Sequence, residues 1–181
     1  MAHIILVTGG SRSGKSAHAL NIAQRLDGPR VFVATCPALD DEMRTRIHEH
    51  RKARQQAGWR TIEEPVDLPA ALARTGDSRV VLVDCLTLWV NNLLYEAEQA
   101  GRAMEESDVQ KHCEAALRAC APLAGTVIFV TNEVGWGIIP ENALARRFRD
   151  LSGRCNTVMA AGADEVVLVV CGLPTHLKRG D

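Results

Sequence analysis

Short, continuous apolar runs alternate along this chain with longer segments in which apolar residues recur at every third or fourth position. The continuous runs are rich in β-branched residues, which is typical of strands buried on both faces of a parallel sheet. They predict strands at 4–8, 31–35, 80–84, 126–131 and 165–170, and weaker runs at 59–63 and 173–178 add two candidates, the second as an edge strand. The segments between them predict helices at 14–27, 39–57, 67–74, 86–98, 107–121 and 141–161.

This alternation predicts an α/β fold in which a mainly parallel sheet carries helices on both faces. The chain has 181 residues, a length that suits one hydrophobic core, since single cores grow to roughly 250 residues before chains divide. No low-complexity linker or internal repeat interrupts the pattern, so we expect one domain over 1–181. In a sheet of this kind, ligands bind at the carboxyl ends of the strands.

The near-zero net charge of the chain argues against a nucleic-acid partner. Lys and Arg number 21 against 22 Asp and Glu, for a formal net charge of -1, whereas nucleic-acid binders usually carry a basic domain or stripe. No apolar run approaches the roughly 20 residues of a membrane-spanning helix, and the first ten residues lack the basic segment of a secretion signal. We therefore expect a cytoplasmic protein with no nucleic-acid partner and no membrane span.

A glycine-rich loop follows the first predicted strand. Its residues are Gly9, Gly10, Ser11, Arg12, Ser13, Gly14, Lys15 and Ser16, which satisfy the phosphate-binding pattern G-x-x-x-x-G-K-[ST] between a strand and a helix. The glycines let backbone N–H groups point at an anion, and the following helix adds its partial positive charge. Lys15 is then expected to reach the β- and γ-phosphates, and the Ser16 hydroxyl to join the shell of a Mg²⁺ ion.

A P-loop nucleotide needs a second oxygen donor for its metal, and Asp84 at the end of the predicted strand 80–84 can supply it. An alternative is that Asp84 caps the helix that follows, and the two roles are compatible. The N-K-x-D tetrapeptide with which small GTPases read guanine is missing, since the sequence at 131–134 is Thr-Asn-Glu-Val. These features predict nucleoside triphosphate, Mg²⁺ and phosphoryl chemistry rather than a small-GTPase switch.

His50 lies on the apolar stripe of the predicted helix 39–57, in helical phase with Met43 and Ile47, whereas His48 falls on the charged side. A histidine in this position is either a core residue or a nucleophile that attacks phosphorus through a neutral imidazole. Cationic neighbours at positions 46, 51, 52 and 54 offer partners for a polyphosphate.

The motifs of this chain occur in a characteristic order. They are LVTGGSRSGKS at 6–16, AT at 34–35, LDDEM at 39–43, RI at 46–47 with His50 three positions after Ile47, WRTIE at 59–63, DCLT at 84–87, TNEVG at 131–135, GI at 137–138, PEN at 140–142, FRD at 148–150, GR at 153–154 and Asn156. On these motifs the chain resembles the bifunctional adenosylcobinamide kinase / adenosylcobinamide-phosphate guanylyltransferase family of cobalamin biosynthesis, and the likeness covers nearly the whole chain.

The resemblance implies a RecA-like P-loop fold, a homotrimer and two reactions. In the first, ATP or GTP phosphorylates adenosylcobinamide. In the second, GMP passes from GTP to adenosylcobinamide phosphate through a GMP-histidine intermediate, which gives adenosylcobinamide-GDP and pyrophosphate. The histidine matches His50, and Lys15 is the other catalytic residue. The matched nucleotide-contacting positions are Gly9, Gly10, Ser11, Arg12, Ser13, Gly14, Lys15, Ser16, Ala34, Thr35, Cys36, Arg51, Lys52, Ala53, Glu63 and Asp84, with Ser16 and Asp84 toward Mg²⁺. Cys36 departs from the Ser or Ala that we expect there.

Two alternatives to this function remain open at the level of sequence. One is a P-loop kinase of a small metabolite in which His50 is structural, and the other is a nucleotide-dependent regulatory switch. The segment 132–142, which contains Trp136, either shapes the corrinoid site or is an ordinary surface loop whose tryptophan packs against the sheet.

Overall fold

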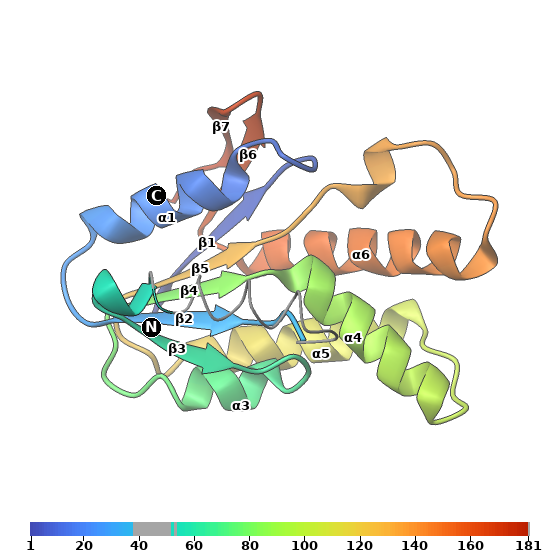
Figure 1. The fold of residues 1–181 in the computed structure, drawn as a ribbon, viewed down its shortest axis with the longest axis horizontal. Helices are drawn as coiled ribbons and strands as arrows, with labels where there is room; N and C mark the ends of the chain where they lie inside the picture. The colour runs from blue at the N-terminus through green and yellow to red at the C-terminus, as the bar shows by residue number, and fades with distance from the viewer. Residues whose placement is uncertain (38–51, 53, 181) are drawn as a thin grey trace.

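The computed structural model describes residues 1–37, 52 and 54–180 (Figure 1). Within these residues seven strands form one sheet, in the order β3-β2-β4-β5-β1-β6-β7. The strands are β1 (His3–Thr8), β2 (Arg30–Ala34), β3 (Trp59–Glu63), β4 (Val80–Asp84), β5 (Thr126–Val130), β6 (Glu165–Val170) and β7 (Leu173–Lys178). The first six pair in parallel, and β7 pairs antiparallel with β6 at one edge.

Helices cover both faces of this sheet (Figure 1). They are α1 (Lys15–Arg25), α3 (Leu68–Ala73), α4 (Leu86–Gln99), α5 (Glu106–Cys120) and α6 (Ala143–Gly162), with a short 3₁₀ helix η1 (Val134–Trp136) before α6. Helix α1 packs on one face over β1, β4, β5 and β6, while α5 packs between α3 and α6 on the other side. The alternation of strand residues produces two apolar cores, one beneath α1 and one beneath the group of α3 to α6.

The sequence pattern predicted this architecture closely. All seven predicted strands are confirmed to within one residue at each end, including the two weaker candidates. The helices predicted near 14–27, 67–74, 86–98, 107–121 and 141–161 are also confirmed, with ends that differ by at most two residues. The predicted helix 39–57 lies mostly outside the described residues, and η1 was not predicted because a single turn carries no periodic signal.

The parallel register brings four strand ends to one edge of the sheet. Asp84 at the end of β4 pairs with Ala34 of β2 on one side and with Val130 of β5 on the other. Strand β5 also pairs with β1, where Val7 faces Val130. The loops after β1, β2, β4 and β5 therefore meet at this edge, as expected for a ligand site in a parallel α/β sheet.

Among the helices that the structure describes, none combines the length and the apolar character needed to cross a membrane.

Candidate nucleotide-binding site

The loop between β1 and α1 has the backbone geometry of an anion-binding site. Gly14 has a φ of 95° and stands directly before α1, whose first residue is Lys15. A side chain at Gly9 would place its Cβ 2.4 Å from the carbonyl oxygen of Val169, so this position requires glycine. Within the described part of the chain, no side chain caps the amino end of α1, which leaves its first N–H groups available to an anion.

Lys15 is buried at the centre of this loop, with 8% of its surface exposed. Its Nζ donates a hydrogen bond to the Gly10 carbonyl at 3.1 Å. Burial lowers the pKa of Lys15, and the nearby Cys85 and Asp84 oppose that shift. A bound phosphate would place a negative charge beside the partly desolvated Lys15 ammonium and compensate for its burial. The geometry therefore suits a lysine that binds phosphate.

Asp84 at the end of β4 lies beside the loop, as the sequence predicted. Burial raises the pKa of Asp84, while a hydrogen bond with the Ser16 side chain and the charges of Lys15 and Arg54 oppose the shift. The carboxylate, the hydroxyl and the ammonium therefore converge on one small region. The alternative that Asp84 caps the next helix is wrong, because the residue at the N-cap of α4 is Cys85.

The structure fits the predicted Mg²⁺ ion at this point. The Ser16 side chain lies close enough to the Asp84 carboxylate to lower its pKa, and oxygen donors of this kind are what Mg²⁺ prefers. The described residues hold no cluster of three or more His, Cys, Asp or Glu side chains suited to a metal. A P-loop ion needs none, since substrate phosphates and water complete its shell.

Thr35 holds the neighbouring backbone in place. Its fully buried hydroxyl donates to the Cys85 carbonyl and accepts from the Cys85 N–H, both at 2.8 Å. The Asn92 amide of α4 donates to the Thr35 carbonyl, also at 2.8 Å. The family resemblance implied that Thr35 contacts the nucleotide, and the structure shows that its side chain bonds the backbone of Cys85, next to Asp84.

The other predicted contacts lie around the same edge. Ala34 pairs with Asp84, and Glu63 is exposed at the end of β3, next to Ala34 in the register. Cys36 is half-buried, and burial together with the Asp84 charge raises the pKa of its thiol. Lys52 is exposed.

Three predicted positions, His50, Arg51 and Ala53, lie outside the described residues. Their neighbour Arg54 places its guanidinium carbon 4.0 Å from the centre of the Phe32 ring, and its charge acts on the Asp84 carboxylate. One of the cations that the sequence grouped around His50 therefore lies near the predicted triphosphate site.

A polar network at the end of β5 was missed as a functional feature, although its TNEVG motif carried the family resemblance. It joins Thr8 of β1, Thr87 of α4, the segment 131–133 and Asn156 of α6 through hydrogen bonds between residues far apart in sequence. The TNEVG motif was the only sign of this network in the sequence. Spacing along the chain does not indicate contacts between residues more than 20 positions apart.

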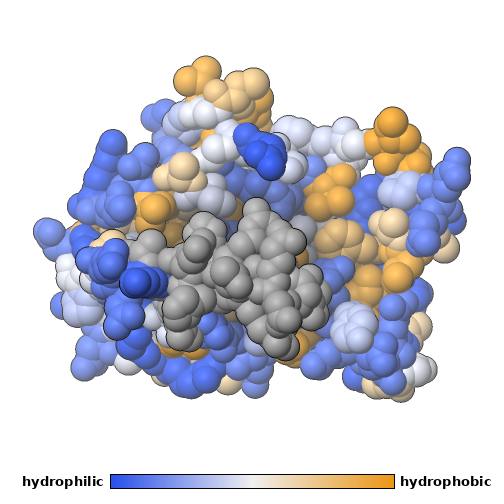
Figure 2. Space-filling view, in the orientation of Figure 1, coloured by the Kyte–Doolittle hydropathy of each residue, from blue (hydrophilic) through white to orange (hydrophobic). Residues whose placement is uncertain are grey.

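The loop after this network exposes apolar side chains. Trp136 is 64% exposed, Ile138 95% and Ile139 64%. Figure 2 shows apolar surface over the loop between η1 and α6, which is one of several apolar patches on this face. The alternative in which Trp136 packs against the sheet is wrong.

The fold and this edge define a class of protein, the P-loop nucleotide-binding proteins. A comparison of folds agrees, because the chain superposes on an ATPase from the type III secretion system of pathogenic bacteria with a TM-score of 0.55. The match covers 96% of this chain and 56% of that one at 10% sequence identity, so it concerns the fold alone.

Sequence comparisons give the family. The family model described as "Cobinamide kinase / cobinamide phosphate guanyltransferase" matches residues 5–177. The bifunctional adenosylcobalamin biosynthesis proteins CobU of Salmonella typhimurium and of Escherichia coli are 43% and 42% identical to this chain, and each match covers 97% of this chain and 99% of the relative. CobP of Pseudomonas aeruginosa is 40% identical over 96% of both chains. The chain belongs to the cobinamide kinase / cobinamide phosphate guanyltransferase family.

Proposed function

We propose that this enzyme phosphorylates adenosylcobinamide with ATP or GTP and then transfers GMP from GTP to the phosphate it has made. The products of the second step are adenosylcobinamide-GDP and pyrophosphate. The observation that carries the proposal is the buried Lys15 in a P-loop beside the Asp84 carboxylate, on whose pKa both Ser16 and Lys15 act, in a chain of this family. The family match favours this function over a kinase of another small metabolite or a regulatory switch.

In the kinase step, the loop 9–16 holds the triphosphate. The uncapped N–H groups of α1 and the Lys15 ammonium neutralise the β- and γ-phosphates. Ser16 and Asp84 would hold Mg²⁺, which when bound adds positive charge against the transferring phosphoryl group. Phosphoryl transfer needs positioning and charge neutralisation more than covalent help, so these groups account for most of its catalysis.

The GMP transfer needs a nucleophile at a different phosphorus. A neutral imidazole at His50 attacks the α-phosphorus of GTP, an N–P bond forms, and the bond to pyrophosphate breaks with its electron pair leaving on pyrophosphate. An oxygen of the corrinoid phosphate then bonds to this phosphorus, and the N–P bond breaks with its electron pair returning to the imidazole. Cations at positions 51, 52 and 54 favour the neutral imidazole, because like charges disfavour protonation.

The exposed apolar loop suits a large acceptor. Trp136, Ile138 and Ile139 come directly after the network that is bonded to the P-loop. An apolar surface of this kind fits the face of a corrin ring, and its place near the strand ends brings the acceptor to the phosphates. We propose that the segment 132–142 contributes to the corrinoid site, and that the enzyme works in the cytoplasm as a homotrimer.

A labelling experiment tests the covalent step. Incubation with GTP labelled at the α-phosphate and Mg²⁺ should leave an acid-labile, alkali-stable label on the wild-type protein and none on His50→Ala. The matched control is His48→Ala, two residues away on the charged side of the predicted helix, which should label normally. Kinase turnover with ATP should survive in His50→Ala. A label that persists in that variant, or that never forms on the wild type, rules out the assignment.

A further inference from the structure

Glu133 lies in the loop between β5 and η1, in direct contact with the start of the P-loop. Its backbone N–H donates to the Gly9 carbonyl at 3.1 Å, and its Oε1 accepts from the Thr8 hydroxyl at 2.5 Å. The Asn156 amide donates to the same Oε1 at 3.2 Å. Strand β5 is the strand between β1 and β4 (Figure 1). The residues that follow it therefore lie between the phosphate-binding loop and Asp84.

The surroundings of Glu133 do not require a negative charge. Both side-chain donors, Thr8 and Asn156, are neutral, and they bond the same carboxylate oxygen. Within the part of the chain that the structure describes, no cation pairs with this carboxylate. A glutamine could accept the same two hydrogen bonds through its amide oxygen.

A carboxylate at this place has an electrostatic cost. It adds negative charge beside a loop built to receive a triphosphate, and like charges repel. The contacts with Thr8 and Asn156 hold the side chain in one orientation, and Oε2 receives no hydrogen bond from the described residues. A fixed carboxylate with one unengaged oxygen at a phosphate site has the chemistry of a general base.

We propose that Glu133 accepts the proton of the acceptor hydroxyl in the kinase step; this inference rests on the proposed function. As the hydroxyl oxygen bonds to the γ-phosphorus, its O–H bond breaks and the proton passes to the Glu133 carboxylate. The bond between the γ-phosphorus and the bridging oxygen breaks at the same time, and its electron pair leaves with the nucleoside diphosphate. The carboxylic acid then returns the proton to water.

The two proposed reactions differ in their need for this group. A hydroxyl acceptor must lose a proton during phosphoryl transfer, whereas a phosphate acceptor is already an anion at neutral pH and needs no base to expose its attacking oxygen. Formation of GMP-histidine involves no corrinoid acceptor at all. Glu133 therefore serves the kinase step and neither half of the guanylyl transfer.

The test compares Glu133→Gln with the wild-type protein. We expect the kcat of the kinase reaction to fall by about a hundredfold or more, as for loss of a general base, with KM for nucleotide and acceptor within about threefold. GMP labelling, and GMP transfer to chemically supplied adenosylcobinamide phosphate, should keep wild-type rates. Glu106→Gln, on the exposed start of α5, is the matched control and should leave both reactions unchanged. Glu133→Asp should recover part of the kinase rate.

Three results would overturn the inference. The first is a Glu133→Gln kinase rate within threefold of wild type, which would make Glu133 a hydrogen-bond acceptor only. The second is an equal loss of both reactions with a lower melting temperature, which would make its role structural. The third is a rise in acceptor KM with unchanged kcat. A wild-type protein without corrinoid kinase activity would instead contradict the proposed function, so the two failures are distinguishable.

Discussion

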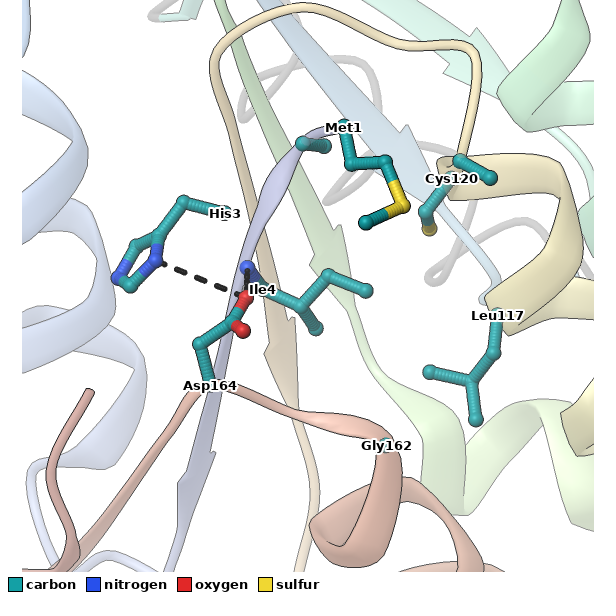
Figure 3. Close-up of a pocket in the computed structure, with 9 residues that line it drawn as sticks. Met1, His3, Ile4, Leu117, Cys120, Gly162 and Asp164 are labelled. Carbon is teal, nitrogen blue, oxygen red and sulfur yellow. Dashed lines mark hydrogen bonds and ion pairs between the residues drawn. The ribbon is translucent and has the colours of Figure 1, made fainter. Parts of the chain in front are cut away.

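The two edges of the sheet differ in how their charged residues are surrounded. At the amino ends of the strands, a cavity of about 420 Å³ opens between β1 and the last turns of α5 and α6 (Figure 3). It is lined by Met1, Ala2, His3, Ile4, Leu117, Cys120, Ala121, Gly162 and Asp164. At the carboxyl ends lies the P-loop with the buried Lys15 and the half-buried Asp84.

The difference lies in how the charges are satisfied. At the amino edge, Asp164 accepts the Ile4 N–H at 2.7 Å and lies 3.6 Å from His3 (Figure 3). The other ring nitrogen of His3 is 2.8 Å from the Glu165 carboxylate. At the carboxyl edge, burial lowers the pKa of Lys15 and raises the pKa of Asp84, so it favours the neutral form of each side chain. Ionisable groups whose pKa values are shifted by burial beside one another are typical of functional sites, whereas His3, Asp164 and Glu165 are partly exposed and contact one another.

Lys15→Ala should have the largest effect. Loss of the ammonium at the centre of the P-loop removes charge neutralisation from both reactions, so we expect kcat/KM to fall by about a hundredfold or more in each. Kinase turnover and GMP labelling measure the two losses. Lys111→Ala is the control, because that ammonium is exposed on α5. Guanylylation that survives in Lys15→Ala would show that the two reactions use separate nucleotide sites.

Asp84→Asn should lower the kinase activity and raise the thermal stability of the protein. The pKa of Asp84 is raised in the folded protein, so the folded state binds this proton more tightly than the unfolded state does, and stability falls as pH rises through this range. This loss of stability begins above the ordinary pKa of an aspartate and is complete above the raised pKa that Asp84 has in the folded protein. At neutral pH the asparagine variant has no buried charge and does not lose this stability. Its Tm should rise by roughly 2–4 °C for each kcal/mol gained in the free energy of unfolding.

Thermal melts between pH 4 and pH 8 measure this effect, and the advantage of Asp84→Asn should shrink toward the acidic end. Kinase activity should fall by about a hundredfold, because the oxygen donor loses its charge. Asp77→Asn, at an exposed loop position, should change neither property. A variant that is less stable than wild type at pH 8 would contradict the burial cost assigned to this carboxylate.

Asp164→Ala should have the smallest effect, and only on stability. The substitution removes the acceptor of the Ile4 N–H at an exposed position, a change worth about 1 kcal/mol or less. Urea unfolding measures that loss, and kcat and KM of both reactions should stay within twofold of wild type. A large kinetic effect would show that the amino edge takes part in function, against the contrast between the two edges.

The strands and the P-loop could be predicted because their signals are local. A continuous β-branched run, a glycine-rich joint and a helical stripe each lie within about 20 neighbouring residues. The two weaker strands, Trp59–Glu63 and Leu173–Lys178, also appeared where their short runs indicated. The assignment of His50, Arg51 and Ala53 to the nucleotide site stays a prediction, since those positions lie outside the described residues.

The sequence by itself determined the order of strands and helices along the chain, the anion-binding loop and the carboxylate that ends β4. Each of these features depends on the types of adjacent residues. Tertiary structure alone decided what those side chains touch. It turned Thr35 inward to hold the Cys85 backbone, left Trp136 exposed, and set Glu133 between Thr8 and Asn156. Such contacts join residues 23 to 125 positions apart, and the packing of the sheet against its helices, rather than local pattern, brings them together.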